Sequence, residues 1–134
     1  ANTPKANIID EVIDFANLGV TAAIGDVYEV LNIPAGTVVL NAGVEVITAE
    51  TTATTGTAAL SGGATYVTAA VVSATGSMTS GDAIGEMFVV YDTADTLDIT
   101  NAVAALTDAK LRVWATVIDK TSLTTDQTLT FTAA

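Results

Sequence analysis

Residues 37–50 read Thr37-Val-Val-Leu-Asn-Ala-Gly-Val-Glu-Val-Ile-Thr-Ala-Glu50, and this stretch carries the strongest indication of the fold. Apolar and polar side chains alternate along it: Val38, Leu40, Ala42, Val44 and Val46 fall on one face, and Thr37, Asn41 and Glu45 on the other. Alternation with period two is typical of a strand that is buried on one face. We therefore expect a long strand with a bulge at Gly43, because a glycine inside a strand pattern often marks a bulge.

Further strand-like runs lie on both sides of this segment. Asp26–Ile33 precedes it across the turn Pro34-Ala-Gly36, in which proline fixes φ and glycine accepts an unusual conformation. The runs that follow are Thr54–Leu60, Thr65–Ser73, Glu86–Tyr91, Leu97–Thr100, Lys110–Asp119 and Gln127–Thr132. About eight to nine short antiparallel strands, separated by turn-forming clusters, predict an all-β fold, either a β-sandwich or a jelly roll.

Two other stretches fit more than one element. Ile8–Ala16 has apolar residues at both helical and strand spacing, and its β-branched residues favour a strand. Asn101–Lys110 fits either one helical turn or a loop. We expect residues 1–134 to form a single domain in which residues 1–7 are an extended arm.

The composition excludes several kinds of chemistry. The chain has 134 residues, with 15 acidic and 4 basic side chains and neither histidine nor cysteine. Disulfides, thiolate zinc sites and cysteine nucleophiles are therefore absent, and so is the commonest general base. The formal charge of −11 argues against nucleic acid and anionic membranes as partners, because proteins bind both through Lys and Arg.

Carboxylates are the remaining catalytic material, and no pair of them stands out. A glycosidase-type acid and base are two carboxyl groups held roughly 5–10 Å apart across a cleft. Nothing in the sequence selects such a pair, so we expect no enzymatic activity and no cofactor. Asp92, Asp95 and Asp98 are candidate calcium ligands, because this cation needs several oxygens from a flexible loop. Their spacing departs from the EF-hand pattern, and roles in turns and caps are the expected alternative.

One strand carries most of the cationic side chains together with the single tryptophan. Within Lys110–Asp119, alternation places Leu111, Val113, Ala115 and Val117 on the core face, and Lys110, Arg112, Trp114 and Ile118 on the outer face. Trp and Arg are enriched among the residues that dominate interface energetics. A cationic strip on an acidic protein predicts an interface with an acidic partner or a neighbouring subunit. The alternative is that Trp114 faces the core.

Two stretches resemble a known group of proteins. Gly25–Ile47 and Leu106–Asp119 are similar to segments of small virion structural proteins of tailed bacteriophages, in particular capsid decoration (cement) proteins. The pattern of strand, Pro-Ala-Gly turn and strand also occurs in jelly-roll modules that bind carbohydrate. The resemblance implies a β-sandwich or jelly roll without catalytic residues that assembles, often as trimers, on an icosahedral head and bridges major capsid subunits.

On this resemblance, the chain is expected in the virion, at the capsid surface, and in the host cytoplasm during assembly. Its partners would be the major capsid protein and further copies of itself, with neither nucleic acid nor membrane. The apolar faces formed by Tyr28 with Val30 and by Val39 with Ile47 would be buried between subunits. The alternative is a carbohydrate- or receptor-binding module of a head or tail fibre. Its aromatic platforms would be Trp114, Tyr28, Tyr66 and Tyr91.

Overall fold

The chain is built from β-strands throughout the part that the computed structural model describes, which comprises residues 6–19, 21–52, 55–80 and 88–120. Nine strands lie in these ranges: β1 (Asn7–Asp14), β2 (Val27–Ile33), β3 (Thr37–Thr48), β4 (Thr57–Ser61), β5 (Thr65–Val71), β6 (Met78–Ser80), β7 (Val89–Tyr91), β8 (Asp95–Ala102) and β9 (Lys110–Asp119). The same ranges hold no helix, and hence none long and apolar enough to cross a membrane. The predicted all-β fold is confirmed.

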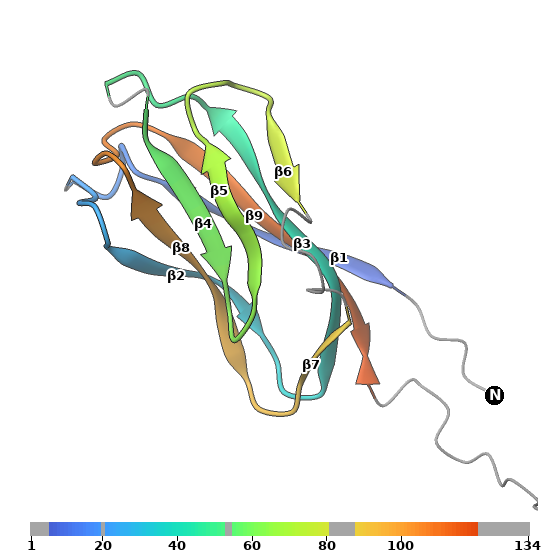
Figure 1. Cartoon of the computed structure of the whole chain (residues 1–134). Helices are drawn as coiled ribbons and strands as arrows, with labels where there is room; N and C mark the ends of the chain where they lie inside the picture. The colour runs from blue at the N-terminus through green and yellow to red at the C-terminus, as the bar shows by residue number, and fades with distance from the viewer. Residues whose placement is uncertain (1–5, 20, 53–54, 81–87, 121–134) are drawn as a thin grey trace, which may run out of the picture.

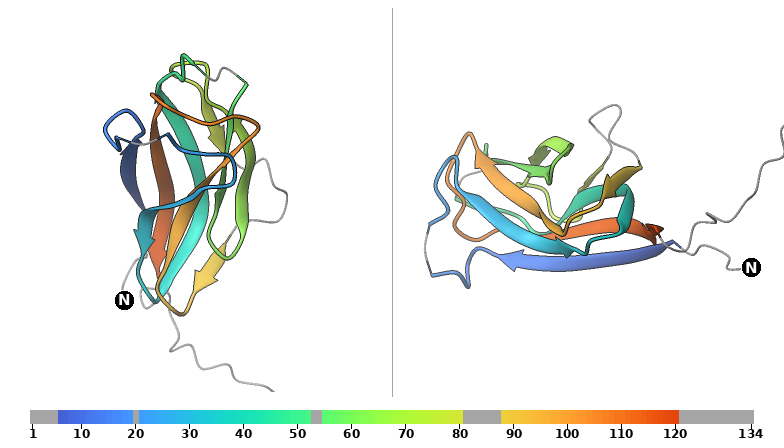
Figure 2. Two further views of the ribbon diagram at one scale, coloured as in Figure 1. Left: turned by 90° about the vertical axis from the view of Figure 1, so that its left-hand side faces the viewer. Right: turned by 90° about the horizontal axis from the view of Figure 1, so that it is seen from below.

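The strands form two antiparallel sheets packed into a sandwich (Figure 1). One sheet has the order β1-β9-β3-β6, with β7 also pairing with β3, and we call it the first sheet. The second sheet has the order β2-β8-β4-β5. The chain crosses between the sheets at most connections, and this strand order is that of a jelly roll. In Figure 2 the edge strands β1 and β2 lie side by side along one border of the sandwich.

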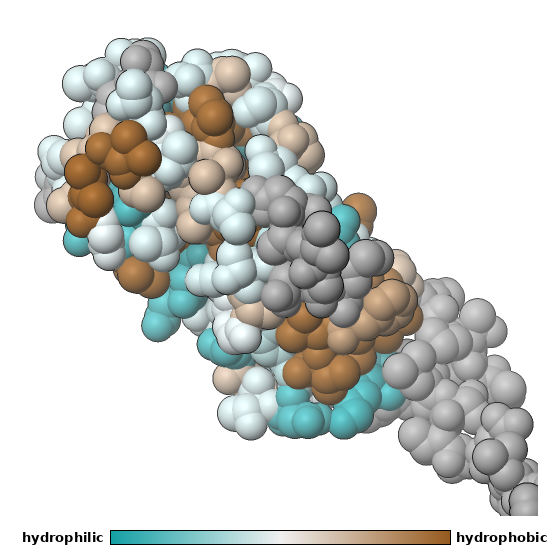
Figure 3. All heavy atoms as spheres, in the orientation of Figure 1, coloured by the Kyte–Doolittle hydropathy of each residue, from teal (hydrophilic) through white to brown (hydrophobic). Residues whose placement is uncertain are grey.

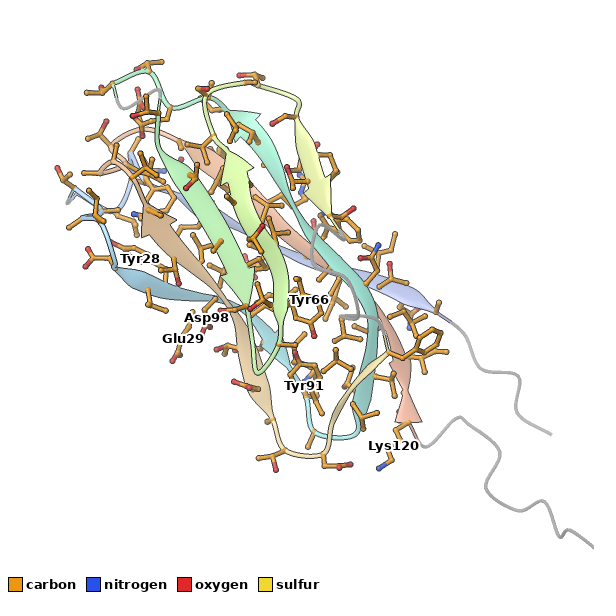
Figure 4. The ribbon with its side chains drawn as sticks, in the orientation of Figure 1. Tyr28, Glu29, Tyr66, Tyr91, Asp98 and Lys120 are labelled. Atoms are coloured by element: carbon orange, nitrogen blue, oxygen red, sulfur yellow. The ribbon has the colours of Figure 1, made fainter. Side chains whose placement is uncertain are left out.

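The core fills the space between the sheets. Its largest fully buried side chains include Phe15, Ile33, Leu60, Tyr66, Leu97, Ile99, Leu106 and Leu111, drawn from both sheets and their connections. The hydroxyls of Tyr66 and Tyr91 lie 2.5 Å apart, and Tyr91 also donates to the carbonyl oxygen of Gly62 (Figure 4). These bonds satisfy polar atoms that would otherwise be unpaired inside an apolar core.

The pairing of β3 with β9 is irregular at Leu40 and again at Ile47, whereas Gly43 pairs regularly with Trp114, so the predicted bulge at Gly43 is wrong. The pairing of β3 with β9 shifts register between Val39 and Asn41. Because a bulge inserts one extra residue, the inward face changes parity there. Val39 is in the core on one side of the bulge, and Ala42, Val44 and Val46 are in the core on the other, while Leu40 is only half-buried.

The other predicted segments agree with the structure in most places. Ile8–Ala16 overlaps β1, a strand as expected, which ends two residues earlier at Asp14. The part of Asn101–Lys110 beyond β8 is a loop up to the start of β9. The weakly patterned β6 is absent from the prediction. The start of Glu86–Tyr91, all of Gln127–Thr132 and most of the predicted arm at residues 1–7 lie outside the described residues.

Candidate interaction surface on the first sheet

The facing of β9 is as the sequence predicts. Its inward side chains, Leu111, Val113, Ala115 and Val117, are buried, and its outward side chains, including Lys110, Arg112, Trp114 and Ile118, are half-buried. The alternative in which Trp114 faces the core is therefore wrong. Because β9 lies between β1 and β3, outward side chains of both neighbours flank the strip.

Arg112 is held between two carboxylates. Its Nε lies 3.1 Å from Oδ2 of Asp10 on β1, and its Nη1 lies 2.7 Å from Oε1 of Glu45 on β3. One cation between two anions leaves this part of the sheet net negative. The predicted cationic strip is thus corrected: its central charge is already neutralised by residues that are distant in the sequence.

Trp114 lies across the backbone of Gly43. A Cβ atom at position 43 would be 2.6 Å from Cζ2 of Trp114 and 2.7 Å from the carbonyl oxygen of Thr79. The indole Nε1 lies 2.9 Å from Sδ of Met78, to which it donates. The ring therefore extends from β9 over β3 to β6, and glycine is required at position 43 because no side chain fits beneath the indole.

These side chains line a shallow groove of about 460 Å³ on the outer surface of the first sheet. Its lining consists of Ile8, Asp10, Glu45, Met78, Arg112 and Trp114, and we call it the outer-sheet groove. Ile8 and Met78 are exposed. An apolar border around a half-buried arginine and a tryptophan has the composition of the central part of a protein interface.

The remaining predicted interface residues lie elsewhere. Lys110 pairs in register with Asp14 and Thr48 at one end of β9, whereas Ile118 pairs with Val38 at the other end. Ile47 is half-buried on β3. The structure therefore brings Arg112 and Trp114 together in one groove but spreads the other residues along the sheet.

Tyr28 belongs to the second sheet and packs toward the core. Its ring meets Phe15 edge-on with centroids 5.5 Å apart, and its hydroxyl donates to Asp26 over 3.3 Å (Figure 4). Burial and the neighbouring Asp26 carboxylate raise the pKa of Tyr28. Val30 also packs against the core, and Val39 is fully buried within it. A subunit contact through Val39 is therefore excluded.

The three candidate calcium ligands do not converge. Asp92 pairs with Lys120, with Nζ and Oδ1 2.7 Å apart. Asp95 accepts the backbone N–H of Thr96, and Asp98 accepts its hydroxyl. Among the described residues no group of three acidic side chains is placed to hold a metal ion. Local hydrogen bonding in a turn and a strand accounts for these aspartates without a cation.

A buried carboxylate, Glu50, was not singled out by the sequence. It follows β3, and its oxygens accept the backbone N–H groups of Thr107, Asp108, Ala109 and Thr52, together with the hydroxyl of Thr107. Burial alone would raise the pKa of Glu50, but the hydrogen bonds at Asp108 and Thr107 outweigh it and lower the pKa to about 2. Glu50 is thus an anchor, ionised at neutral pH, for the loop between β8 and β9.

Three solved structures share the fold. The chain superposes with a TM-score of 0.65 on a chain of the capsid of Ralstonia phage GP4, at 15% identity, over 86% of this chain and 84% of that one. It superposes with a TM-score of 0.61 on a chain of the cyanophage Pam1 capsid asymmetric unit, at 24% identity, over 86% of this chain and 85% of that one. The TM-score is 0.59 for a chain of the acidic stable capsid structure of Helicobacter pylori bacteriophage KHP30, at 12% identity, over 90% of this chain and 91% of that one. No protein-family model and no curated protein matches the sequence.

Proposed function

We propose that the protein is a non-enzymatic structural component of a phage virion, and specifically a capsid decoration protein that bridges major capsid subunits on the outside of the head. The observation that carries the proposal is the likeness of nearly the whole chain to chains of three phage capsids. The absence of histidine and cysteine from the sequence fits a role that resides in surfaces.

The outer-sheet groove supports the part of the proposal that concerns subunit contacts. It offers Trp114 and Arg112 between the exposed apolar side chains of Ile8 and Met78, and the ion pairs already compensate the charge of the arginine. Two copies of a chain with a charge of −11 repel each other, and at the groove Arg112 reduces that repulsion because it offsets one of the two carboxylates. We assign this groove to contact between copies, as a trimer on the head.

Decoration by many copies needs only modest affinity at each site. When one protein engages two neighbouring capsid subunits, the second contact forms at high effective concentration and adds stability without new chemistry. The proposed location is the capsid surface, with the host cytoplasm as the place of assembly.

The carbohydrate-binding alternative loses two of its four aromatic platforms. Tyr66 and Tyr91 are buried and hydrogen-bonded to each other, so neither ring is available to stack on a sugar. Tyr28 packs on Phe15, and Trp114 lies over Gly43. Phe88 is an exposed aromatic side chain among the described residues, and it is not one of the four predicted platforms.

The proposal is tested by comparing purified heads with and without the protein. Heads that carry it should withstand a higher temperature before releasing their DNA, and adding the purified protein back to deficient heads should restore that resistance. Equal resistance of the two kinds of head, together with no protein on purified particles, would refute the proposal.

A further inference from the structure

Two loops lie against each other at the end of the sandwich where β2 begins and β8 ends. The N–H of Gly25 donates to the carbonyl of Asn101 over 2.8 Å, and the N–H of Asn101 donates to Asp26 over 3.1 Å. Ala22 and Leu106 exchange two backbone hydrogen bonds of 2.9 Å. These bonds fix the backbone at Ala22, Gly25 and Asp26 in one loop and at Asn101 and Leu106 across from it, and Glu50 anchors the latter loop at residues 107–109.

The paired loops nevertheless expose large apolar side chains. The exposed fraction is 62% for Ile24, 58% for Val27 and 63% for Val103. Figure 3 shows brown, hydrophobic residues gathered at this end of the molecule, where β2 begins and β8 ends. We call Ile24, Val27 and Val103 the loop-end patch. Exposed apolar groups on a rigid frame are typical of a binding surface.

Val103 is held in a backbone conformation that valine rarely adopts. The N–H of Ala104 donates to the carbonyl of Ala102 over 2.8 Å, and φ of Val103 is +71°. This is a three-residue γ-turn of the rare form with positive φ, which is strained for a β-branched residue. Most of the other described positions with positive φ are glycines, for example Gly25 in the facing loop, and the second non-glycine residue there is Phe88, at +57°. The exposed valine gains little from the described fold, so the strain points to an external contact.

The charge around the patch indicates which kind of partner fits. Asp26 lies in the loop beside it and Asp108 in the facing loop, and residues 15–26 and 101–109 contain neither Lys nor Arg. Asp14, the last residue of β1, lies opposite Lys110 in the register of β1 and β9. A second copy of this chain would oppose carboxylates with carboxylates. A complementary partner therefore presents an apolar surface bordered by basic side chains.

We propose that the loop-end patch docks the protein on the phage capsid shell, at an apolar site of the shell that Lys or Arg residues border. This inference rests on the proposed function and adds the surface through which it acts. The γ-turn presents the side chain of Val103 to the shell, while the outer-sheet groove remains available for contact between copies.

The first test places a charge in the patch and a matched charge elsewhere. Val103→Asp and Ile24→Asp are compared with Val90→Asp, which changes a 49% exposed valine on β7. Co-sedimentation with shells that lack the protein measures the affinity. The two patch variants should lose affinity by about tenfold or more, and Val90→Asp should bind as the wild type does. Equal binding by all three variants would overturn the inference while leaving the proposed function standing, whereas no binding by the wild type would refute the proposed function itself.

The second test separates docking from folding. Val103→Gly removes the side chain but suits the positive φ, so its melting temperature should equal or exceed that of the wild type while its affinity for shells falls. Val90→Gly is the matched control, and it should lower the melting temperature because β7 has ordinary strand geometry. A Val103→Gly protein that melts earlier than Val90→Gly, or that binds shells fully, contradicts the inference. So does a Val103→Gly protein whose self-association, measured by light scattering, is lost while shell binding persists.

Discussion

Glu50 and Arg112 are both charged residues with several partners from distant parts of the chain, but they differ in their exposure to water. Glu50 is 1% exposed and accepts hydrogen bonds from the backbone of the loop before β9. The Arg112 side chain is 40% exposed, and those of Asp10 and Glu45 are 52% and 28% exposed. Solvent can replace the partners of Arg112 but not those of Glu50.

Because the two residues differ in exposure, their loss should have different effects on stability. Removal of the buried acceptor leaves several backbone N–H groups unsatisfied, whereas removal of a surface partner leaves a group that water solvates. Stability is therefore concentrated at Glu50, and the outer-sheet groove is free to respond to a partner.

The largest effect is expected from Glu50→Ala. Three backbone N–H groups of the loop before β9 would lose their common acceptor, and we expect the free energy of unfolding to fall by about 3 kcal/mol or more. Urea denaturation measures this as a lower midpoint with an unchanged slope. Glu45→Ala, on the strand that precedes Glu50 and half-exposed, is the control and should cost less than about 1 kcal/mol. Equal losses in the two variants would remove the distinction between the regions.

The free energy of unfolding should fall in acid because Glu50 becomes protonated. The pKa of Glu50 is about 2 in the folded protein against a reference value of 4.5, so its stabilisation is complete above pH 4.5 and is lost as the pH falls toward 2. About 2 kcal/mol should disappear between pH 7 and pH 3. Because other carboxylates titrate in the same range, the relevant measurement is the difference between wild type and Glu50→Gln in urea at both pH values. A wild type that loses no more than Glu50→Gln would contradict the assignment.

A smaller effect is expected from Gly43→Ala, which fills the space beneath the indole. The new Cβ meets Trp114 at 2.6 Å and the carbonyl oxygen of Thr79 at 2.7 Å, so the ring or β6 has to move. We expect a loss of about 1–3 kcal/mol and a red shift of the tryptophan emission as the indole becomes more exposed. An unchanged spectrum with unchanged stability would show that the ring does not rest on Gly43.

The smallest effect on stability is expected from Arg112→Ala. Its two ion pairs are partly exposed, so the free energy of unfolding should fall by less than about 1 kcal/mol. Self-association, measured by light scattering, should weaken far more than stability does, because the groove loses its only cation. Lys120→Ala, which breaks the exposed pair with Asp92, is the control and should leave self-association unchanged. Unaltered association of Arg112→Ala would separate the groove from contact between copies.

The sequence predicts features that depend on neighbouring residues and misses those that depend on distant ones. The facing of β9 follows from alternation alone, and it correctly separates Val113 from Trp114. The pattern predicts a cationic strip at Arg112 and does not reveal its partner Glu45, because Glu45 lies 67 residues away. Glu50 was missed for the same reason, since Thr107 lies 57 residues from it. The position of the bulge depends on pairing with β9, which residues 37–50 do not encode by themselves.

The strand order also determines when the chain is able to fold. The first described strand, β1, pairs with the last, β9. Among the described pairings, only β4 and β5 are consecutive strands that pair as a hairpin. Contacts of such high sequence separation make folding slow, on the order of milliseconds to seconds. During synthesis the first sheet cannot form until β9 has left the ribosome, and until then β1 lacks its partner strand. The interval before closure is when the chain is most exposed to misassembly.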